Sequence, residues 1–279
     1  MLRWFIPVVV FASACGDGSA TPTFDAAPTV DAGPAVPIRG SVQLLELALD
    51  GPGGPNAYAS VSAQFFDGER SNYHALVDDD GTCQRWTFTP TFCDPACDQG
   101  FCNDGVCIPY PTLVGSGALT ITGLTEPLEL APKGDIYYAP AALPTNLFAD
   151  DATIAATLAG DADGLPALAL STRGTPPLAL TISDGKIAMP NGTPHTLRWT
   201  PASNDPSARV HVTINANNLG HGSPYLGIIE CDVSDGAGQV TIPAAMIDAF
   251  PATEAWEACA GSDCPFSHAT RYHRDQAAV

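Results

Sequence analysis

Basic side chains are scarce in this chain: 11 Lys and Arg stand against 30 Asp and Glu, for a formal net charge of −19 at pH 7. Proteins that bind nucleic acid do so largely by neutralising phosphates with Lys and Arg. A surface this acidic repels a phosphate backbone, so we expect no nucleic-acid partner. Acidic charge also keeps exported proteins soluble and supplies oxygen ligands for divalent cations.

The sequence also lacks the motifs that identify common enzyme classes. It contains no GxxxxGK[ST] phosphate-binding loop, no dinucleotide fingerprint and no HExxH. The nearest approach to a GxSxG nucleophile elbow is GHGSPYLG, in which Ser223 is out of register beside His221. We therefore predict no catalytic residues and favour a non-enzymatic protein. The alternative is an exported hydrolase whose site is assembled from scattered side chains such as His195, His221, Asp232 and Asp235.

Long helical patterns are missing as well. One short stretch after Pro243, in which Met246, Ile247 and Phe250 share a face, predicts about two turns of helix. Elsewhere, short apolar runs alternate with period two, as expected of half-buried strands. The runs are AYASVSAQFF, GALTITGL, PLALTIS, ARVHVTIN and IIECDV.

Turn-forming residues separate these runs, since the chain has 26 prolines and 26 glycines. Short strands interrupted at this rhythm are typical of β-sandwiches. We predict an all-β fold of one or two antiparallel β-sandwiches of the immunoglobulin or fibronectin kind, with a small disulfide-rich insertion.

The N-terminus, MLRWFIPVVVFASAC, has one basic residue, Arg3, an apolar run, and then small residues before Cys15. These are the three parts of a secretory signal, and the run is shorter than the roughly 20 residues of a bilayer span. We predict a signal peptide over residues 1–14. Residues 15–40 follow as a Pro-, Ala- and Asp-rich linker, a composition that predicts an extended, unpacked segment.

A run of small residues that ends in cysteine resembles the lipobox of bacterial lipoproteins. The resemblance implies cleavage before Cys15 and acylation of this residue with a fatty acid such as palmitate. The family prefers Leu three residues before the cysteine, and this chain has Ala12 there. Plain secretion with cleavage near Ala14 therefore stays open as the alternative.

Two prolines and a glycine interrupt the strand pattern at RGTPP, residues 173–177, where we place a domain boundary. This predicts a β-rich domain over residues 41–173, with a cysteine-rich insertion at residues 83–107, and a β-sandwich domain over residues 174–279. Trp199 should lie in the second core. A single interleaved domain is the alternative.

A wider resemblance is carried by the stretch ending in Cys15, the linker DAAPTVDAGP, the cluster CxxxCxxxxCxxxxC, the strand GALTITGL and the C-terminal LRWTP…IIECDVSDGAGQVTIPAAMI. This order resembles a group of uncharacterised lipoproteins of Gram-negative bacteria, over nearly the whole chain. It implies a location in the cell envelope, anchored at the outer membrane, and brings no catalytic residues with it. The expected partners are the membrane, through the lipid, and an envelope protein or glycan.

Eight further cysteines follow Cys15, and export places them in an oxidising compartment, which favours disulfides. The spacing CDPACDQGFCNDGVC also approaches that of a zinc knuckle, so zinc stays open as an alternative, although no histidine lies nearby. By analogy with small extracellular modules, we expect the alternating pairs Cys93 with Cys102 and Cys97 with Cys107. The remaining cysteines are Cys259 and Cys264, which could close a small loop, and Cys83 and Cys231, which would pair with each other or elsewhere.

Calcium is the second metal hypothesis, because several turns are rich in carboxylate oxygens; it would make the protein a calcium-dependent adhesion module. None of these turns completes the DxDxDG loop with its distal Glu, and acidic residues are ordinary in turns between strands, so we predict no cofactor. The acidic residues concerned are Asp78, Asp79, Asp80, Asp161, Asp163, Asp232 and Asp235. A sugar-binding face would need exposed aromatic rings, for which the candidates are Tyr137, Tyr138 and Tyr225.

Overall fold

The computed structural model describes residues 6–7, 10–11, 38–51, 54–139, 142–161, 165–180, 187–202, 206–216, 225–251 and 267–277. Among these residues the secondary structure is almost entirely β, with one α-helix and one short 3-10 helix. The predicted all-β class is confirmed. The immunoglobulin or fibronectin kind of sandwich stays a prediction.

The first sheet is built on a long hairpin of β3 (Arg39–Gly51) and β4 (Gly54–Phe66), and β11 (Ile136–Tyr138) pairs with the other edge of β4. Two short strands, β1 (Ile6–Pro7) and β2 (Val10–Phe11), pair with β3. From Val61 to Phe66 the side chains of β4 alternate between buried and half-buried, as the AYASVSAQFF pattern predicted, whereas Ala57, which was expected on the buried face, is exposed.

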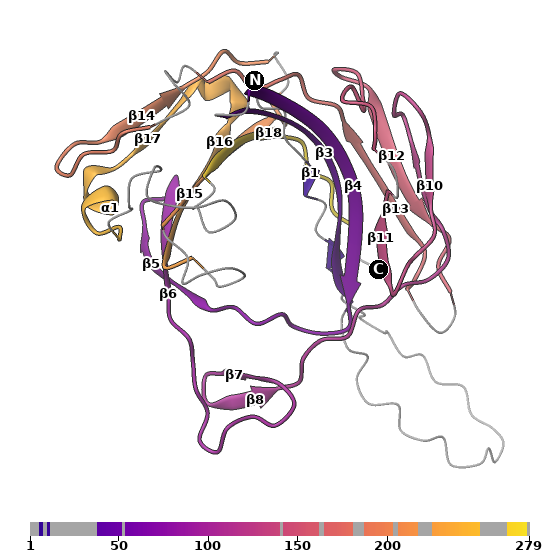
Figure 1. Cartoon of the computed structure of the whole chain (residues 1–279), viewed down its shortest axis with the longest axis horizontal. Helices are drawn as coiled ribbons and strands as arrows, with labels where there is room; N and C mark the ends of the chain where they lie inside the picture. The colour runs from indigo at the N-terminus through magenta and orange to yellow at the C-terminus, as the bar shows by residue number, and fades with distance from the viewer. Residues whose placement is uncertain are drawn as a thin grey trace, which may run out of the picture.

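The second sheet has the antiparallel order β10-β9-β12-β13, formed by β9 (Leu119–Thr122), β10 (Leu128–Leu130), β12 (Thr153–Leu158) and β13 (Leu168–Arg173). Figure 1 shows β3 and β4 curving alongside this sheet. Side chains of both sheets form one cluster, which we call the first core. Its members include Val42, Leu44, Phe65, Ile121, Ile154 and Leu170.

The third sheet has the order β18-β15-β16-β6-β5, and its strands come from distant parts of the chain. They are β5 (His74–Asp79), β6 (Cys83–Phe88), β15 (Arg209–Asn215), β16 (Gly227–Ser234) and β18 (His268–Tyr272). All its neighbouring strands are antiparallel.

One side of the third sheet is covered by the paired strands β14 (His195–Arg198) and β17 (Gln239–Ile242), together with α1 (Ala244–Asp248), as Figure 1 shows. The short 3-10 helix η1 (Asp235–Ala237) connects β16 to β17. The side chains between these layers form the second core. It includes Trp199, as predicted, with Val210, Val212, Ile229, Val240 and Met246.

The predicted helix after Pro243 is confirmed, and Met246 and Ile247 are its buried residues. The run PLALTIS behaves differently from the prediction. Leu178 is fully buried and Leu180 forms an isolated bridge to Trp199, but neither lies in a named strand, and Ile182 lies outside the described residues.

The strand pairing crosses the expected domain boundary at residues 173–177. Strands β5 and β6 precede this boundary in sequence, yet β6 pairs with β16, which follows it. The third sheet therefore contains hydrogen-bonded strands from both predicted domains. The division of the chain into two domains stays a prediction, with the single interleaved domain as its alternative.

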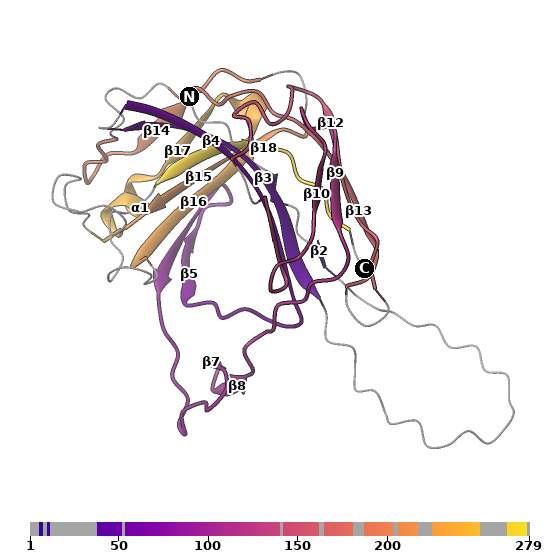
Figure 2. The same ribbon diagram turned by 45° about the vertical axis from the view of Figure 1, so that its right-hand side comes forward.

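A small hairpin of β7 (Phe101–Asn103) and β8 (Val106–Ile108) lies between β6 and β9 in sequence. Figures 1 and 2 both show it projecting away from the three larger sheets. Since Cys83 lies in β6, the cysteine-rich insertion is narrower than the expected residues 83–107. We call residues 91–110 the stapled module.

Candidate functional site

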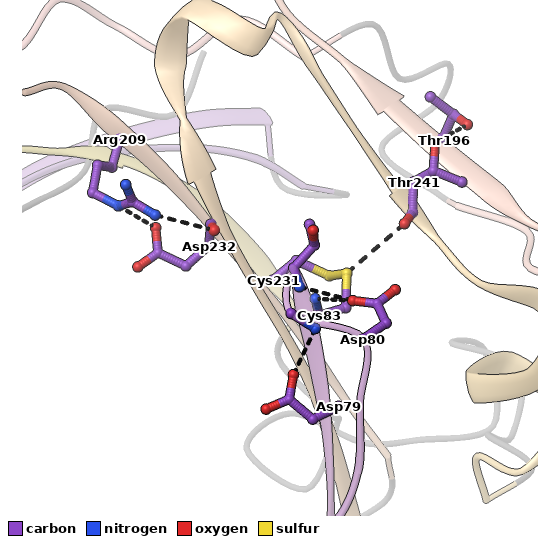
Figure 3. The surroundings of a disulfide bond; sticks show 10 residues. Asp79, Asp80, Cys83, Thr196, Arg209, Cys231, Asp232 and Thr241 are labelled. Atoms are coloured by element: carbon purple, nitrogen blue, oxygen red, sulfur yellow. Dashed lines mark hydrogen bonds and ion pairs between the residues drawn. A yellow bond between two sulfur atoms is a disulfide. The ribbon is translucent and has the colours of Figure 1, made fainter. Parts of the chain in front are cut away.

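A disulfide connects the two halves of the third sheet. Cys83 in β6 and Cys231 in β16 lie directly opposite each other, with a Cα–Cα distance of 4.0 Å, and they are 148 residues apart in sequence. Both side chains are buried in the second core, and the Cys83 Sγ lies 3.8 Å from the carbonyl oxygen of Thr241 in β17 (Figure 3). This bond fixes the register between segments that the sequence places far apart.

The acidic turn before β6 is held by its own carboxylates. Asp79 accepts hydrogen bonds from the Gly81 amide at 2.8 Å and from the Gln84 side chain at 2.9 Å. Asp80 accepts bonds from the amide of Cys83 at 2.7 Å and from that of Thr82 at 2.8 Å (Figure 3). The bond from Gln84, followed by that from Gly81, lowers the pKa of Asp79. These carboxylates therefore cap the turn that leads into the disulfide, and calcium stays the alternative hypothesis for this turn.

Asp232 lies on the opposite side of β16 from Cys231 and binds two side chains. Arg209 donates from Nε to its Oδ1 at 2.8 Å and from Nη2 to its backbone oxygen at 3.1 Å (Figure 3). The Tyr272 hydroxyl donates to Asp232 Oδ2 at 2.6 Å. Burial, reinforced by the bond to the neighbouring carboxylate, raises the pKa of Tyr272 to about 12. This cluster ties β15, β16 and β18 together.

Asp235 forms a second, fully buried cluster. Arg271 donates from Nε to Asp235 Oδ1 at 2.9 Å, and the two side chains are 2% and 1% exposed. The other nitrogens of Arg271 donate to backbone oxygens, among them that of Pro177 at 2.8 Å and that of Thr200 at 2.6 Å. The amide of Ala202 donates to Asp235 Oδ2 at 2.6 Å. The pair thus fastens the segments around β13 and β14 to β18, since a buried charge must be paired and hydrogen-bonded.

The described residues named for a hydrolase, Asp232, Asp235 and His195, have different neighbours. Asp232 and Asp235 bind different arginines, as described above. His195 lies in β14, opposite Ile242, and burial lowers its pKa. His221 and Ser223 lie outside the described residues. Sequence reasoning did not single out the contact of His273 Nδ1 with the Ser207 hydroxyl at 3.1 Å, or the arginine partners of the two carboxylates.

The stapled module holds four cysteines in two disulfides, Cys93–Cys102 and Cys97–Cys107. This is the alternating pairing expected by analogy. The Sγ atoms of Cys93, Cys97 and Cys107 lie within 4.8 Å of one another. Zinc binds cysteine as the thiolate, and a sulfur in a disulfide is not a thiolate, so a zinc site here requires reduction of both bonds.

Two glycines shape the module. A side-chain carbon on Gly100 would lie 2.1 Å from the Ile108 carbonyl oxygen, so only glycine fits this close approach of backbone to backbone. Asp104 and Gly105, with φ of 48° and 80°, form the two-residue loop of the hairpin. Asp-Gly in a two-residue loop is a strong hairpin signal, and it is visible in the sequence.

Apolar side chains are exposed on this module. Phe92 is 87% exposed, Tyr110 61% and Val106 59%, whereas Phe101 is 8% exposed. Among the candidate sugar-binding rings, Tyr138 is 44% exposed, but Tyr137 is fully buried in the first core, so its assignment as an exposed ring is wrong. The alternation of β11 explains the difference, since neighbouring residues of a strand point to opposite faces.

Several predicted residues lie outside the described part of the chain. They are the lipidation candidate Cys15, the cysteines Cys259 and Cys264, and Asp163. Within the described residues, no helix combines the length and apolar character that a membrane span requires.

Comparison with protein-family models, with curated proteins and with solved structures finds no match for this chain.

Proposed function

We propose that this protein is a non-enzymatic lipoprotein of the bacterial cell envelope, anchored at the outer membrane by lipid on Cys15, which binds another envelope component through its β-structured part. The observation that carries the proposal is the set of three disulfides, Cys83–Cys231, Cys93–Cys102 and Cys97–Cys107. Disulfides persist in exported proteins and are rare where thiols are kept reduced. They support the export that the N-terminal sequence predicts.

The bonding of the acidic residues favours this proposal over an exported hydrolase. A catalytic carboxylate needs an oxygen directed at a substrate or at a histidine. Both carboxylate oxygens of Asp232 and of Asp235 instead accept hydrogen bonds that connect strands or loops. These side chains therefore have a structural explanation that needs no substrate.

The calcium-dependent adhesion module is disfavoured by the same kind of observation. At the most acidic turn, Asp79 and Asp80 accept four hydrogen bonds from their own turn and from β6. Thermal unfolding with and without millimolar calcium tests the calcium-dependent adhesion module. We expect an unchanged midpoint, and a rise of several degrees would restore the calcium hypothesis.

The anchor is tested by growing cells with radiolabelled palmitate. We expect label in the wild-type protein and none in a Cys15→Ser variant. Ala12→Leu brings the sequence closer to the lipobox and should be labelled at least as well as the wild type, while Ser13→Ala serves as a control that keeps Cys15. An unlabelled wild type, or a labelled Cys15→Ser variant, would contradict the lipid anchor.

The location is tested by separating the membranes on a density gradient. The wild-type protein should sediment with the outer membrane, and the Cys15→Ser variant should be released into the soluble fraction. A wild-type protein that is itself soluble would favour plain secretion with cleavage near Ala14.

A further inference from the structure

We propose that the stapled module is the docking surface of this protein, and that its partner is a cationic protein surface with an apolar pocket. The inference rests on the proposed function, because it names the site and the chemistry of the partner. It is carried by an exposed apolar strip, by a frame of two disulfides, and by an acidic rim that consists of Asp94, Asp98 and Asp104.

The apolar strip follows from the register of the hairpin. Phe101 lies opposite Ile108, and Asn103 lies opposite Val106, while the Cys102 and Cys107 pair points to the other face. Val106 and Ile108 therefore share a face with Phe101. The Tyr110 ring continues the strip, since its centroid lies 6.3 Å from that of Phe101.

The two ends of the strip, Val106 and Tyr110, are exposed to solvent, and Phe101 between them is buried. Val106 is 59% and Tyr110 61% exposed, while Phe101 at 8% is covered. Phe92, at 87%, adds a further exposed ring to the module. Tyrosine and other aromatic residues are enriched at interfaces because they offer a large contact area at a low cost in side-chain entropy. Single exposed apolar residues are ordinary, but here they gather on about twenty residues of chain.

The frame is rigid without a partner. Two disulfides close loops of 9 and 10 residues, and the Asp104–Gly105 turn fixes the hairpin. A preorganised surface loses little conformational entropy on binding, which increases affinity. The disulfides therefore hold the hairpin that carries Phe101 and Val106, and the Tyr110 ring packs against Phe101.

The charge of the module selects the partner. Asp94, Asp98 and Asp104 are all exposed, and no Lys or Arg occurs between Arg85 and Lys133. A second copy of this chain, with a net charge of −19, would be repelled, and so would anionic lipid headgroups. A cationic protein surface is attracted to the rim, while an apolar pocket receives the strip.

The position of the module leaves room for such a partner. Its return segment is fixed to the end of β4, through a bridge from Leu113 to Phe66 and a hydrogen bond from the Thr112 amide to Asp67 at 2.6 Å. Arg39, where β3 begins, pairs with Phe66 at the same end. The module and the start of β3, which follows the predicted linker in sequence, thus lie at one end of the fold, and Figures 1 and 2 show the module projecting beyond it.

The test places the photo-crosslinking residue p-benzoylphenylalanine at Val106 or Tyr110 of the full chain, expressed in its native cells. Matched controls carry the same residue at Val77 in β5 and at Tyr138 in β11, which are 48% and 44% exposed. We expect one adduct of discrete mass from each module position and none from the controls. Mass spectrometry of the adduct should identify a protein of net positive charge.

A second arm removes the charges of the rim by Asp94→Asn, Asp98→Asn and Asp104→Asn together. We expect adduct yield to fall about tenfold, because rim charges govern the rate of encounter, and the wild-type yield to fall as salt is raised. The control triple is Glu126→Gln, Glu129→Gln and Asp135→Asn, which are exposed acids outside the module and should leave the yield unchanged. Peptide mapping without reduction verifies that both disulfides persist in each variant.

Four results would overturn the inference: no adduct from the module positions, an adduct of two copies of this chain, a glycosidase-sensitive heterogeneous adduct, or an adduct unaffected by the charge variant. Adducts from Val77 or Tyr138 alone would also overturn the docking surface while leaving the proposed binding function intact. Loss of palmitate labelling tests the anchor separately. The failure of the inference and that of the proposed function are thus distinguishable.

Discussion

The two cores of this protein are stabilised in different ways. The first core is formed mainly by apolar side chains of the β3–β4 hairpin and of the sheet of β9, β10, β12 and β13, and the buried Glu46 of β3 accepts a hydrogen bond from the Phe148 amide at 3.0 Å. The second core contains a disulfide and, beside it, a buried ion pair between Arg271 and Asp235. Among the described residues, the long-range disulfide and the buried ion pair thus both lie at the core whose strands come from the most distant segments.

The difference follows from the entropy of closing a long loop. Strand β3 ends at Gly51 and β4 begins at Gly54, so their pairing closes a short loop, whereas β6 and β16 are separated by more than one hundred residues. Closing a longer loop costs more entropy, and a covalent bond across it removes that cost from the unfolded chain. We therefore expect the second core to depend on its cross-links and the first core to depend on apolar packing.

The largest effect is expected on removal of the long-range disulfide by Cys83→Ala with Cys231→Ala. The sequence separation of 148 residues corresponds to about 5 kcal/mol in the chain-entropy model. Hydrogen exchange measured on peptides should show loss of protection in β15 and β16, while β3 and β4 keep theirs.

The control for this variant is Cys97→Ala with Cys107→Ala, which opens a loop of only 10 residues in the stapled module. It should leave the protection of both cores unchanged. Equal loss of protection in the two cores after removal of the Cys83–Cys231 bond would show that they unfold as one unit, as the single interleaved domain predicts.

The next effect concerns the buried ion pair. Arg271→Met leaves the Asp235 carboxylate buried without its guanidinium partner, and such changes cost about 3–5 kcal/mol. The control is Arg173→Met, because the Arg173–Asp151 pair is 57% and 66% exposed and exposed pairs contribute about 0–1 kcal/mol. Urea unfolding measures both. Equal losses for Arg271→Met and Arg173→Met would contradict the role of the buried pair.

A smaller effect is expected in the first core. The Tyr137 hydroxyl donates to the Ser116 carbonyl at 2.6 Å and accepts from the Ser116 amide at 2.8 Å, and both residues are buried. Tyr137→Phe should cost about 1–3 kcal/mol because it leaves these backbone groups unpaired. Tyr138→Phe, at the exposed neighbouring position, should change the free energy of unfolding by less than about 0.5 kcal/mol. Thermal unfolding that fails to separate the two variants would contradict this assignment.

Local patterns in the sequence predicted much of both cores. Period-two alternation identified the buried faces of β4, β9, β15 and β16, because the side-chain period of a strand depends only on neighbouring residues. Trp199 was assigned to the second core for the same reason. The Asp104–Gly105 hairpin could also have been predicted from its turn residues.

Long-range pairings could not be predicted in this way. Nothing in CQRWTF indicates that Cys83 faces Cys231, and Asp235 has the appearance of an ordinary acidic turn residue until Arg271 is placed beside it. The same limit applies to Tyr137 and Tyr138, since an adjacent pair of tyrosines does not reveal which ring points inward. The exposure of the stapled module likewise depends on where the surrounding sheets lie.

The Asp232 cluster is more exposed than the buried Asp235 pair, and it is expected to contribute less. The pKa of Tyr272 is raised to about 12 from an ordinary value near 10. The folded state therefore favours the protonated phenol, and this contribution to stability is fully present below pH 10 and is lost as the pH rises through 12. Tyr272→Phe should cost about 1.5 kcal/mol at neutral pH, the lower end of the range for a hydrogen bond to a charged group, because Asp232 is 37% exposed. Between pH 10 and 12 the wild-type free energy of unfolding should fall more steeply than that of the variant. Parallel curves in urea unfolding across this range would contradict the assignment, because groups common to both proteins cancel in the difference.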